Sequence, residues 1–262
     1  MRRLKILTVF IVLFTFWTGS VFAAPYHEEP EWVKEEHHNV PVFVDSKGNP
    51  HQNLYINHNH TIIVDTYYMK WAQPAIVFCA EKGYLDGMLS SKYFLSPQSW
   101  IDKCDLAILL GRMEAIDYKK YTQEVFSDIK FSDFDLSEDY ENTDWYYNLS
   151  PYYINWAGKE GILQGTGQGL LGNNEITREH IAVMIDRYVE KYTSLYEGVN
   201  FSHTAVSFKD EDKIAGWAKE SIRRLAAIRL INGDHLGFYN PKDNTNRAQI
   251  CQIIYNIAQR GN

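Results

Sequence analysis

Apolar side chains recur at helical spacing in three separate stretches of the chain. In the clearest stretch Ile181, Met184, Ile185 and Tyr188 occupy positions i, i+3, i+4 and i+7, which lie on one face of an α-helix. Each stretch opens with a capping residue and a basic residue, and its apolar face starts three positions after the base. The pattern predicts three copies of one helix and identifies a repeat protein. The three openings are Asp102-Lys103, Thr177-Arg178 and Asn246-Arg247.

The capping residues predict how these helices begin. The hydroxyl of Thr177 can accept a hydrogen bond from the unpaired backbone N–H groups of the first turn. Asn246 and Gln249 have the spacing of a capping box, in which the fourth residue reaches back to the N–H of the cap. Arg178 follows its cap at the positive end of the helix dipole, where an anion is favoured and a cation is not. We therefore expect the base to serve a purpose outside its own helix.

Another helix precedes each capped helix, so that one repeat holds two helices. Each repeat begins with an apolar residue two positions before an aspartate, at Asp65, Asp133 and Asp210, and a tryptophan then opens the first helix. The tryptophans are Trp71 in the first copy, Trp145 or Trp156 in the second and Trp217 in the third.

The first helix of a repeat ends in a turn that is rich in glycine. Gly83 and Gly161 suit the left-handed backbone of a helix C-cap, whereas Arg229 occupies the corresponding position of the third copy. We expect the third turn to be made differently or under mild strain. A second glycine closes each turn, at Gly87, Gly165 and Gly233.

The repeats divide the chain into five segments. A basic start, an apolar run and a small-residue exit indicate that residues 1–23 are a secretory signal peptide. An uncleaved membrane anchor is the alternative, although the apolar run is short for a span. We expect an irregular segment over 24–62 and repeats over 63–120, 121–195 and 196–262. The residue directly after the expected cleavage site is not a cysteine and no hydrophobic tail closes the sequence, so we expect neither a lipid anchor nor a membrane span after cleavage.

Residues 24–62 contain six of the nine histidines of the chain. A zinc site is conceivable where histidines accompany carboxylates, but the spacings match no standard motif and favour a solvated segment. Two short strands are expected at 42–44 and 61–64, on either side of a turn at 47–50. This segment is also the part of the chain that could recruit another surface protein. The six histidines are His27, His37, His38, His51, His58 and His60.

Composition adds two constraints. The net charge of −7 argues against general binding of nucleic acids, which need a basic face, so local cations must hold any anionic ligand. The hydrophobic fraction of 45% is sufficient for a folded core. An odd number of cysteines leaves a free thiol or an intermolecular disulfide open. Because Cys79 and Cys251 align with alanines of other repeats, we interpret them, together with Cys104, as small core residues.

The sequence offers little support for catalysis. Residues 167–172 match the dinucleotide pattern G-x-G-x-x-G, but a helix precedes them where that pattern requires a strand. The neighbouring carboxylates Asp210, Glu211 and Asp212 lie in a polar loop, where solvated surface is the simpler interpretation. We therefore predict no enzymatic activity, no metal site and no cofactor.

What recurs instead is a base at a helix start close to a tryptophan. An aromatic face beside a cation and free backbone N–H groups suits an acidic sugar, because the ring can lie on the indole while the carboxylate pairs with arginine. The alternative interpretation places the tryptophans in the core.

The three capped helices resemble the S-layer homology domain family, which tethers bacterial surface proteins to cell-wall polysaccharide. The hallmark of the family is an I-T-R-A-E-F-A run after a glycine turn. Residues 176–182, Ile-Thr-Arg-Glu-His-Ile-Ala, come closest to it. Residues 245–251 and then 101–107 are more distant copies, and the resemblance covers about residues 63–262.

The resemblance implies a mainly α-helical fold in which three repeats form a pseudo-threefold assembly around a central helix bundle. It implies as ligand a secondary cell-wall polysaccharide, typically with a pyruvate ketal whose carboxylate meets the arginine of the motif in a groove between repeats. The residues expected to bind or shape these grooves are Arg178, Arg247, Lys103, Thr177, Asn246, Trp71, Trp145, Trp217, Gly165 and Gly233.

The three grooves are not expected to be equivalent. Lys103 keeps the positive charge but lacks the planar guanidinium that binds a carboxylate through two hydrogen bonds. Asp102 places a carboxylate beside it that would repel an acidic ligand. Arg178 and Arg247 are therefore the main expected contacts, and alanine at either position should leave the fold intact because neither residue lies on an apolar face.

The function implied is non-covalent anchoring of a secreted protein to the cell wall, at the cell surface. One alternative is a structural protein of the surface layer whose repeats contact other proteins. Another is a secreted enzyme with an unrecognised site.

Overall fold

The computed structural model describes residues 31, 35, 53–88, 93–117, 120, 145–165, 176–203 and 207–261. Six α-helices carry the fold of these residues, which confirms the prediction of a mainly helical protein. They are α2 (Gln73–Glu81), α3 (Lys103–Met113), α4 (Trp145–Lys159), α5 (Arg178–Tyr192), α6 (Lys219–Ala227) and α7 (Arg247–Arg260). The predicted signal peptide, the strand at 42–44, Asp133 and the glycine pattern at 167–172 lie outside the described residues.

Shorter elements connect these helices. Two strands, β1 (Leu54–Ile56) and β2 (Thr61–Ile63), precede the first α-helix. The remaining elements are 3-10 helices: η2 (His58–His60), η3 (Tyr67–Ala72), η6 (Phe201–His203) and η7 (Glu211–Lys213).

The two strands form an antiparallel hairpin, in which β2 confirms the strand expected at 61–64 and β1 is a strand that the sequence analysis did not expect. Leu54 lies opposite Ile63, so β2 pairs with a strand inside the segment expected to be irregular. Leu54, Ile56 and Ile63 are at most 4% exposed and belong to the same core cluster as the helices. Burial of these side chains against α2 orders residues that show no long apolar pattern.

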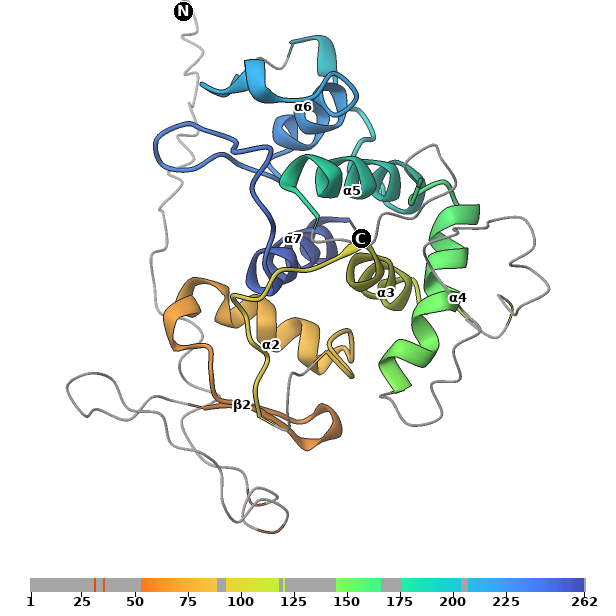
Figure 1. Ribbon diagram of the computed structural model, residues 1–262, viewed down its shortest axis with the longest axis vertical. Coiled ribbons are helices and arrows are strands. Elements are labelled where there is room, and N and C mark those ends of the chain that lie inside the picture. The colour runs from red at the N-terminus through yellow and green to blue at the C-terminus, as the bar shows by residue number, and fades with distance from the viewer. Residues whose placement is uncertain are drawn as a thin grey trace, which may run out of the picture.

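Each helix that begins with one of the three bases packs most extensively against another α-helix. Thus α3 packs on α4, and α5 packs on α6. The cycle closes between the two ends of the described chain, where α7 packs on α2. Figure 1 shows α3, α5 and α7 near the centre, with α2, α4 and α6 around them. One hydrophobic core therefore includes side chains from all six helices.

The segments just before α3, α5 and α7 are joined by a closed cycle of backbone hydrogen bonds. Ile101 donates its N–H to the carbonyl of Thr245 at 3.0 Å, and Thr245 donates to Ile176 at 3.3 Å. Ile176 completes the cycle by donating to Ile101 at 3.1 Å. All three residues are at most 2% exposed, so these bonds hold the three helix starts together inside the protein.

The helix before each turn differs in length. α4 has 15 residues, whereas α2 and α6 have 9. When Ile154 is aligned with Ile76, Pro151 falls at the first position of α2, so α4 extends the shared helix toward its N-terminus. Trp145 is the first residue of α4, and Trp156 is only 1% exposed and belongs to the core.

A residue in the left-handed region follows α2, α4 and α6 alike. Gly83 and Gly161 have φ angles of 71° and 73°, and Arg229 adopts the same left-handed region at 55°. Leu230 donates to the carbonyl of Leu225 at 2.9 Å and closes the helix end. Arg229 thus makes its turn in the region that the glycines use, which side-chain-bearing residues disfavour, and the mild strain expected there stays a prediction.

Arg229→Gly should therefore stabilise the protein by about 0.5–1 kcal/mol. Glycine removes the left-handed penalty of about 1–2 kcal/mol, and its greater freedom in the unfolded chain offsets part of that gain. Gly161→Ala is the matched reverse change, because a Cβ at Gly161 would meet no atom within 4 Å and adds conformational strain alone. Urea unfolding measures both variants, and an Arg229→Gly protein no more stable than wild type would contradict the strain.

The cysteines confirm their interpretation as core residues. Cys79 and Cys251 are fully buried, Cys104 is 7% exposed, and none of the three forms a disulfide. Burial raises the pKa of the Cys79 thiol well above its ordinary value, so this side chain stays protonated and unreactive.

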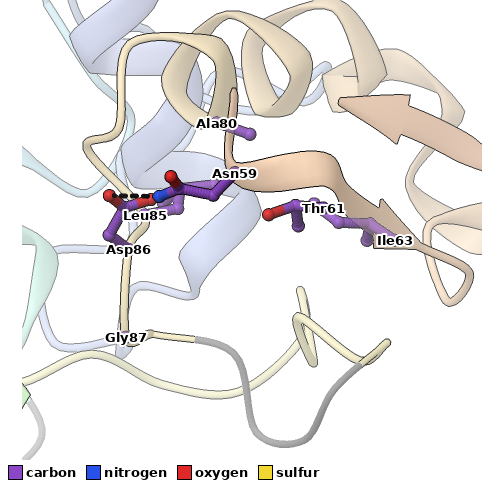
Figure 2. A pocket seen from close by; sticks show the side chains of 7 residues that line it. All are labelled: Asn59, Thr61, Ile63, Ala80, Leu85, Asp86 and Gly87. Atoms are coloured by element: carbon purple, nitrogen blue, oxygen red, sulfur yellow. Dashed lines mark hydrogen bonds between the residues drawn. The ribbon is translucent and has the colours of Figure 1, made fainter. Parts of the chain in front are cut away.

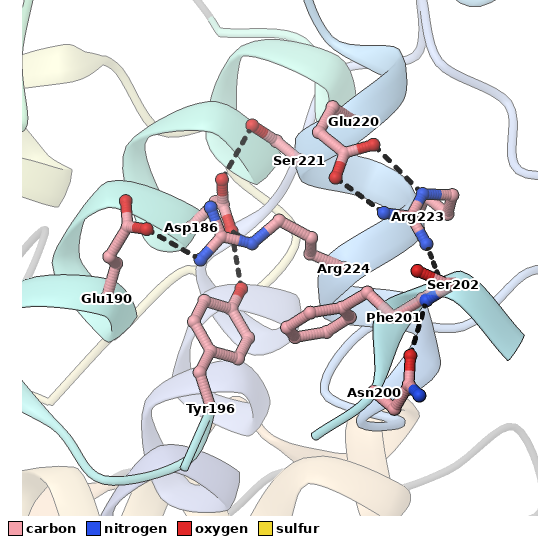
Figure 3. A network of polar contacts seen from close by, with 10 residues as sticks. All are labelled: Asp186, Glu190, Tyr196, Asn200, Phe201, Ser202, Glu220, Ser221, Arg223 and Arg224. Atoms are coloured by element: carbon pink, nitrogen blue, oxygen red, sulfur yellow. Dashed lines mark hydrogen bonds and ion pairs between the residues drawn. The ribbon is translucent and has the colours of Figure 1, made fainter. Parts of the chain in front are cut away.

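A polar network fixes the linker between α5 and α6 (Figure 3). Asp186, 5% exposed, accepts hydrogen bonds from the Tyr196 hydroxyl and from Ser221 Oγ, and lies 3.4 Å from Arg224 Nε. Arg224 also stacks on Tyr196 and pairs with Glu190 at 2.9 Å. Burial raises the pKa of Asp186, although these partners oppose the shift. The network secures the junction of the second and third units.

Candidate ligand-binding groove

The three bases occupy the first positions of their helices, as the sequence predicts. Asp102 and Asn246 form capping boxes, and Asn246 Oδ1 accepts from the N–H of Gln249 at 2.9 Å. Thr177 is the N-cap of α5, but its side chain makes no capping bond. Its hydroxyl lies 2.7 Å from His180 Nδ1 instead, which corrects the expected bond to the backbone.

The backbone N–H groups at these helix starts are not free for a ligand. In α5, Arg178 donates its N–H to the carbonyl of Asp243 at 2.8 Å, and Glu179 donates to Pro241 at 3.1 Å. In α7 the first two N–H groups likewise donate to carbonyls of the loop before α3, those of Ser99 and Pro97. The expected use of free N–H groups is therefore wrong for α5 and α7, because the loop of the next unit already pairs with them.

The side chain of Arg178 holds the same loop. Its Nε donates to the carbonyl of Tyr239 at 2.8 Å and its Nη2 to that of Asn232 at 3.0 Å. The guanidinium lies over the Tyr239 ring at 4.7 Å, and the Tyr239 hydroxyl donates to the carbonyl of Arg178 at 2.9 Å. Burial raises the pKa of Tyr239 although the charge of Arg178 opposes it. Arginine and tyrosine thus fix each other's position.

Arg247 makes the corresponding contacts with the first unit. Its Nη1 donates to the carbonyls of Met88 and Leu95, at 2.8 and 2.7 Å. Leu95 precedes Pro97 by two positions, as Tyr239 precedes Pro241, so the two arginines contact equivalent loops. Each of these two arginines, a cation at the positive end of its helix dipole, therefore links its helix to a loop from another part of the chain. This contact is the purpose outside its own helix that the sequence analysis expects of the base.

An aspartate holds each of these loops from the other side. Asp210, 2% exposed, accepts the N–H groups of Tyr239 and Asn240, both at 2.8 Å. Asp65 accepts those of Leu95 and Ser96 at 3.0 and 2.7 Å. These bonds explain why an aspartate follows an apolar residue by two positions at the beginning of a repeat. One carboxylate can accept hydrogen bonds from two buried backbone N–H groups at once.

A pocket of about 200 Å³ brings Arg178 together with Trp71. Trp71 is 54% exposed, so the interpretation of this tryptophan as core is wrong. Amide side chains contribute hydrogen-bonding groups, and Arg178 is the one charged side chain among the described residues that line the pocket. Asn232, Gln249, Gln252 and Asn256 supply the amides.

A second pocket, of about 550 Å³, adjoins the first. Arg178, Asn232 and Gln249 line both pockets. The larger one also includes Trp100, which is 48% exposed, and Gly233. A Cβ at Gly233 would lie 2.8 Å from the carbonyl oxygen of Phe238, so glycine permits the close approach of the two backbone segments. Because the two pockets share these three lining residues, we refer to them together as the Arg178 groove.

Lys103 and Trp217 both lie near His180 and line neither pocket of the Arg178 groove. Trp217, 54% exposed, contacts the ring of His180 at 4.8 Å between centroids. Burial lowers the pKa of His180, and the nearby charge of Lys103 lowers it further. Lys103 itself is only 7% exposed. The structure thus groups Trp217, His180 and Lys103, and the sequence analysis missed His180.

Two further predicted residues have only their backbone position to report. Trp145 is the first residue of α4, and Gly165 is half-buried after the second turn. A third pocket, of about 150 Å³, lies between the hairpin and the turn that ends at Gly87, where Asn59 Nδ2 donates to Asp86 Oδ2 at 3.1 Å (Figure 2). Its described lining has no cation and no aromatic ring, so it differs from the Arg178 groove.

The contacts of Arg178 change the expectation that alanine at this position leaves the fold intact. Alanine at Arg178 would leave the carbonyls of Tyr239 and Asn232 without their donor. Arg178 lies off the apolar face of α5 but still contributes to stability. Substitutions of Arg178 must therefore be tested for folding as well as for binding.

Comparison with known proteins identifies the repeated unit. The family model of the S-layer homology domain matches residues 138–182 and 207–251. Over 192 residues the chain is 30% identical to the exoglucanase XynX of Acetivibrio thermocellus, which covers 73% of this chain and 16% of that protein. It is 28% identical over 190 residues to the amylopullulanase of Thermoanaerobacterium thermosulfurigenes, covering 72% of this chain and 9% of the relative.

A surface protein is among the relatives as well. The S-layer protein of Bacillus thuringiensis subsp. finitimus is 25% identical over 184 residues, 70% of this chain and 20% of the relative. The chain thus spans at most a fifth of the length of these three relatives. No helix in the described part of the chain is long and apolar enough to cross a membrane. Two stretches of the chain, residues 138–182 and 207–251, thus match the S-layer homology domain, and this match together with the S-layer relative indicates a location at the cell surface.

Proposed function

We propose that the protein anchors non-covalently to the bacterial cell wall by binding an acidic secondary cell-wall polysaccharide in the Arg178 groove. The observation that carries this proposal is the charge of the smaller pocket, in which Arg178 is the one charged side chain among the described lining residues. No carboxylate of the described residues pairs with Arg178, and its Nη1 has no hydrogen-bond partner among them. A ligand carboxylate, such as that of a pyruvate ketal, would supply the missing anion.

Trp71 supplies the second element of carbohydrate recognition. Its exposed indole can cover the apolar C–H face of a sugar ring, and the surrounding amides can pair with hydroxyl groups. The relatives support the same function, since they include polysaccharide-degrading enzymes and S-layer proteins that share only a small part of their length with this chain.

We further propose that residues 63–120 form a third repeat and that the three repeats form a pseudo-threefold assembly. The cyclic hydrogen bonds among Ile101, Ile176 and Thr245 support this arrangement. So do the equivalent loop contacts of Asp65 and Asp210, and the cyclic pairing of the helices. Repeat boundaries at 121–195 and 196–262 follow from the same alignment, with residues 1–23 as an export signal and 24–62 as a segment that can recruit another surface protein.

The grooves are proposed to differ in strength. Arg178 and Arg247 carry the planar fork that suits a carboxylate, and Lys103 does not. Lys103 is also almost fully buried, which limits its reach toward a ligand. The site formed by Lys103, His180 and Trp217 is therefore the weakest.

Trp71→Ala should weaken binding to purified cell walls about tenfold without changing thermal stability. The indole is half exposed, so its removal costs little packing, whereas a bound sugar would lose its stacking surface. Sedimentation with purified walls measures the binding. Tyr68→Ala is the matched control, because Tyr68 is 77% exposed on the same 3-10 helix and lines neither part of the groove. Wild-type affinity in Trp71→Ala would overturn the assignment of this surface.

A further inference from the structure

The larger pocket of the Arg178 groove differs in chemistry from the smaller one. Two cations and two carboxylates line it, so the described lining is formally neutral. These charges are largely engaged within the protein: Lys242 pairs with the buried Glu179, and Asp234 accepts the N–H groups of Leu236 and Phe238 at 2.9 Å. The hydrogen bonds to Asp234 lower the pKa of its carboxyl, which therefore stays ionised.

Trp100 stands beside this pocket on a rigid backbone. It forms a β-bridge with Asn246, and the next residue, Ile101, is 1% exposed and belongs to the buried cycle of hydrogen bonds. A fixed backbone under a half-exposed indole provides a preorganised flat surface, because little conformational freedom remains to be lost on binding. The volume of about 550 Å³ lies within the range of small-molecule sites.

Amide side chains complete the lining of the larger pocket. Asn232, Asn240 and Gln249 offer both donors and acceptors, which suits the hydroxyl groups of a sugar more than a phosphate or a hydrophobic ligand. Arg178, Asn232 and Gln249 line both pockets, which brings them close enough for one polymer to reach both. The larger pocket would then hold the unit next to the acidic one.

We propose that the Trp100 pocket is a second sugar subsite, which takes an uncharged unit of the polysaccharide whose carboxylated unit pairs with Arg178. This proposal rests on the proposed function of the Arg178 groove and adds the length and charge pattern of the ligand. The recognised element is an acidic sugar joined to a neutral sugar, with one tryptophan for each ring: Trp71 for the acidic unit and Trp100 for the neutral one.

Calorimetric titration with two probes tests the subsite. The probes are a pyruvylated monosaccharide and a two-unit wall fragment that contains the same pyruvylated sugar. Wild-type protein should bind the fragment more tightly than the monosaccharide. Trp100→Ala should lose about tenfold in affinity for the fragment and keep its affinity for the monosaccharide, since only the fragment reaches the second pocket. Trp100→Phe should restore part of the loss, because a smaller aromatic face remains.

The controls separate this proposal from the one on which it rests. Leu236→Ala removes another exposed apolar side chain, 54% exposed and outside both pockets, and should leave both affinities unchanged. An unchanged affinity of Trp100→Ala for the fragment, or an equal loss for both probes, would overturn the second subsite and leave the Arg178 site standing. Wild-type protein that binds neither probe would overturn the proposed function itself. Should Trp100→Ala fail to fold, Trp100→Phe and Trp100→Gln give the same comparison.

Discussion

Arg178→Ala should lower the affinity of the protein for purified cell walls by about 100-fold. Truncating one partner of a hydrogen-bonded charge pair costs about 2–5 kcal/mol of binding free energy, and Arg178 is the charged residue of the smaller pocket. The variant should also be less stable by about 2 kcal/mol, because the hydrogen bonds to Tyr239 and Asn232 and the stacking on the Tyr239 ring are lost together.

Two further variants separate the binding role of Arg178 from its structural role. Arg178→Lys keeps the charge but loses the fork, so both affinity and stability should fall between those of wild type and alanine. Lys120→Ala removes one positive charge from a side chain that is 76% exposed, and should change neither quantity. Sedimentation with walls and circular dichroism melting measure the two effects. A folded Arg178→Ala protein with wild-type affinity would show that the arginine holds the loop and does not touch the ligand.

Asp210→Ala should destabilise the protein by about 3 kcal/mol. Its carboxylate accepts two backbone N–H groups, those of Tyr239 and Asn240, and a buried donor left without a partner costs about 1–3 kcal/mol. In a chain of this size such a loss lowers the melting temperature by about 6–12 °C. The loop that loosens carries the carbonyls held by Arg178, so wall binding should weaken as well.

Asp65→Ala provides the matched comparison. It removes the same pair of bonds from Leu95 and Ser96, so its melting temperature should fall by a similar amount. Leu95 and Ser96, which lose their acceptor, do not line the Arg178 groove, whereas Tyr239 and Asn240 do, and wall affinity should therefore fall less than in Asp210→Ala. Equal affinities for the two variants would contradict the placement of the principal site at Arg178.

The starts of the second helices could be predicted because local chemistry determines them. Capping residues, the base and the apolar spacing identify the starts of α3, α5 and α7 without tertiary information. The left-handed turn at Arg229 follows from alignment with two glycines. Each of these features depends on residues within a few positions of one another.

What could not be predicted depends on contacts between distant residues. The sequence places Arg178 beside free N–H groups, yet those groups and the guanidinium itself bind a loop about 60 residues further along the chain. The hairpin strand β1 is ordered by burial against the core, which a three-residue strand cannot reveal. The sequence gives only a weak indication for Trp100, which directly precedes a repeated motif. Its half-exposed indole lines a pocket together with Asn232 and Gln249, and this arrangement appears only in the folded structure.

Binding to walls with and without their pyruvyl groups tests the central claim most directly. Wild-type protein is sedimented with purified walls and with the same walls after chemical removal of the pyruvate ketals, over a range of protein concentrations and at a fixed salt concentration. If a carboxylate of the polymer pairs with Arg178, removal should lower the affinity about as much as Arg178→Ala does, and the variant should no longer distinguish the two preparations. Equal binding of wild-type protein to both preparations would contradict recognition of an acidic sugar.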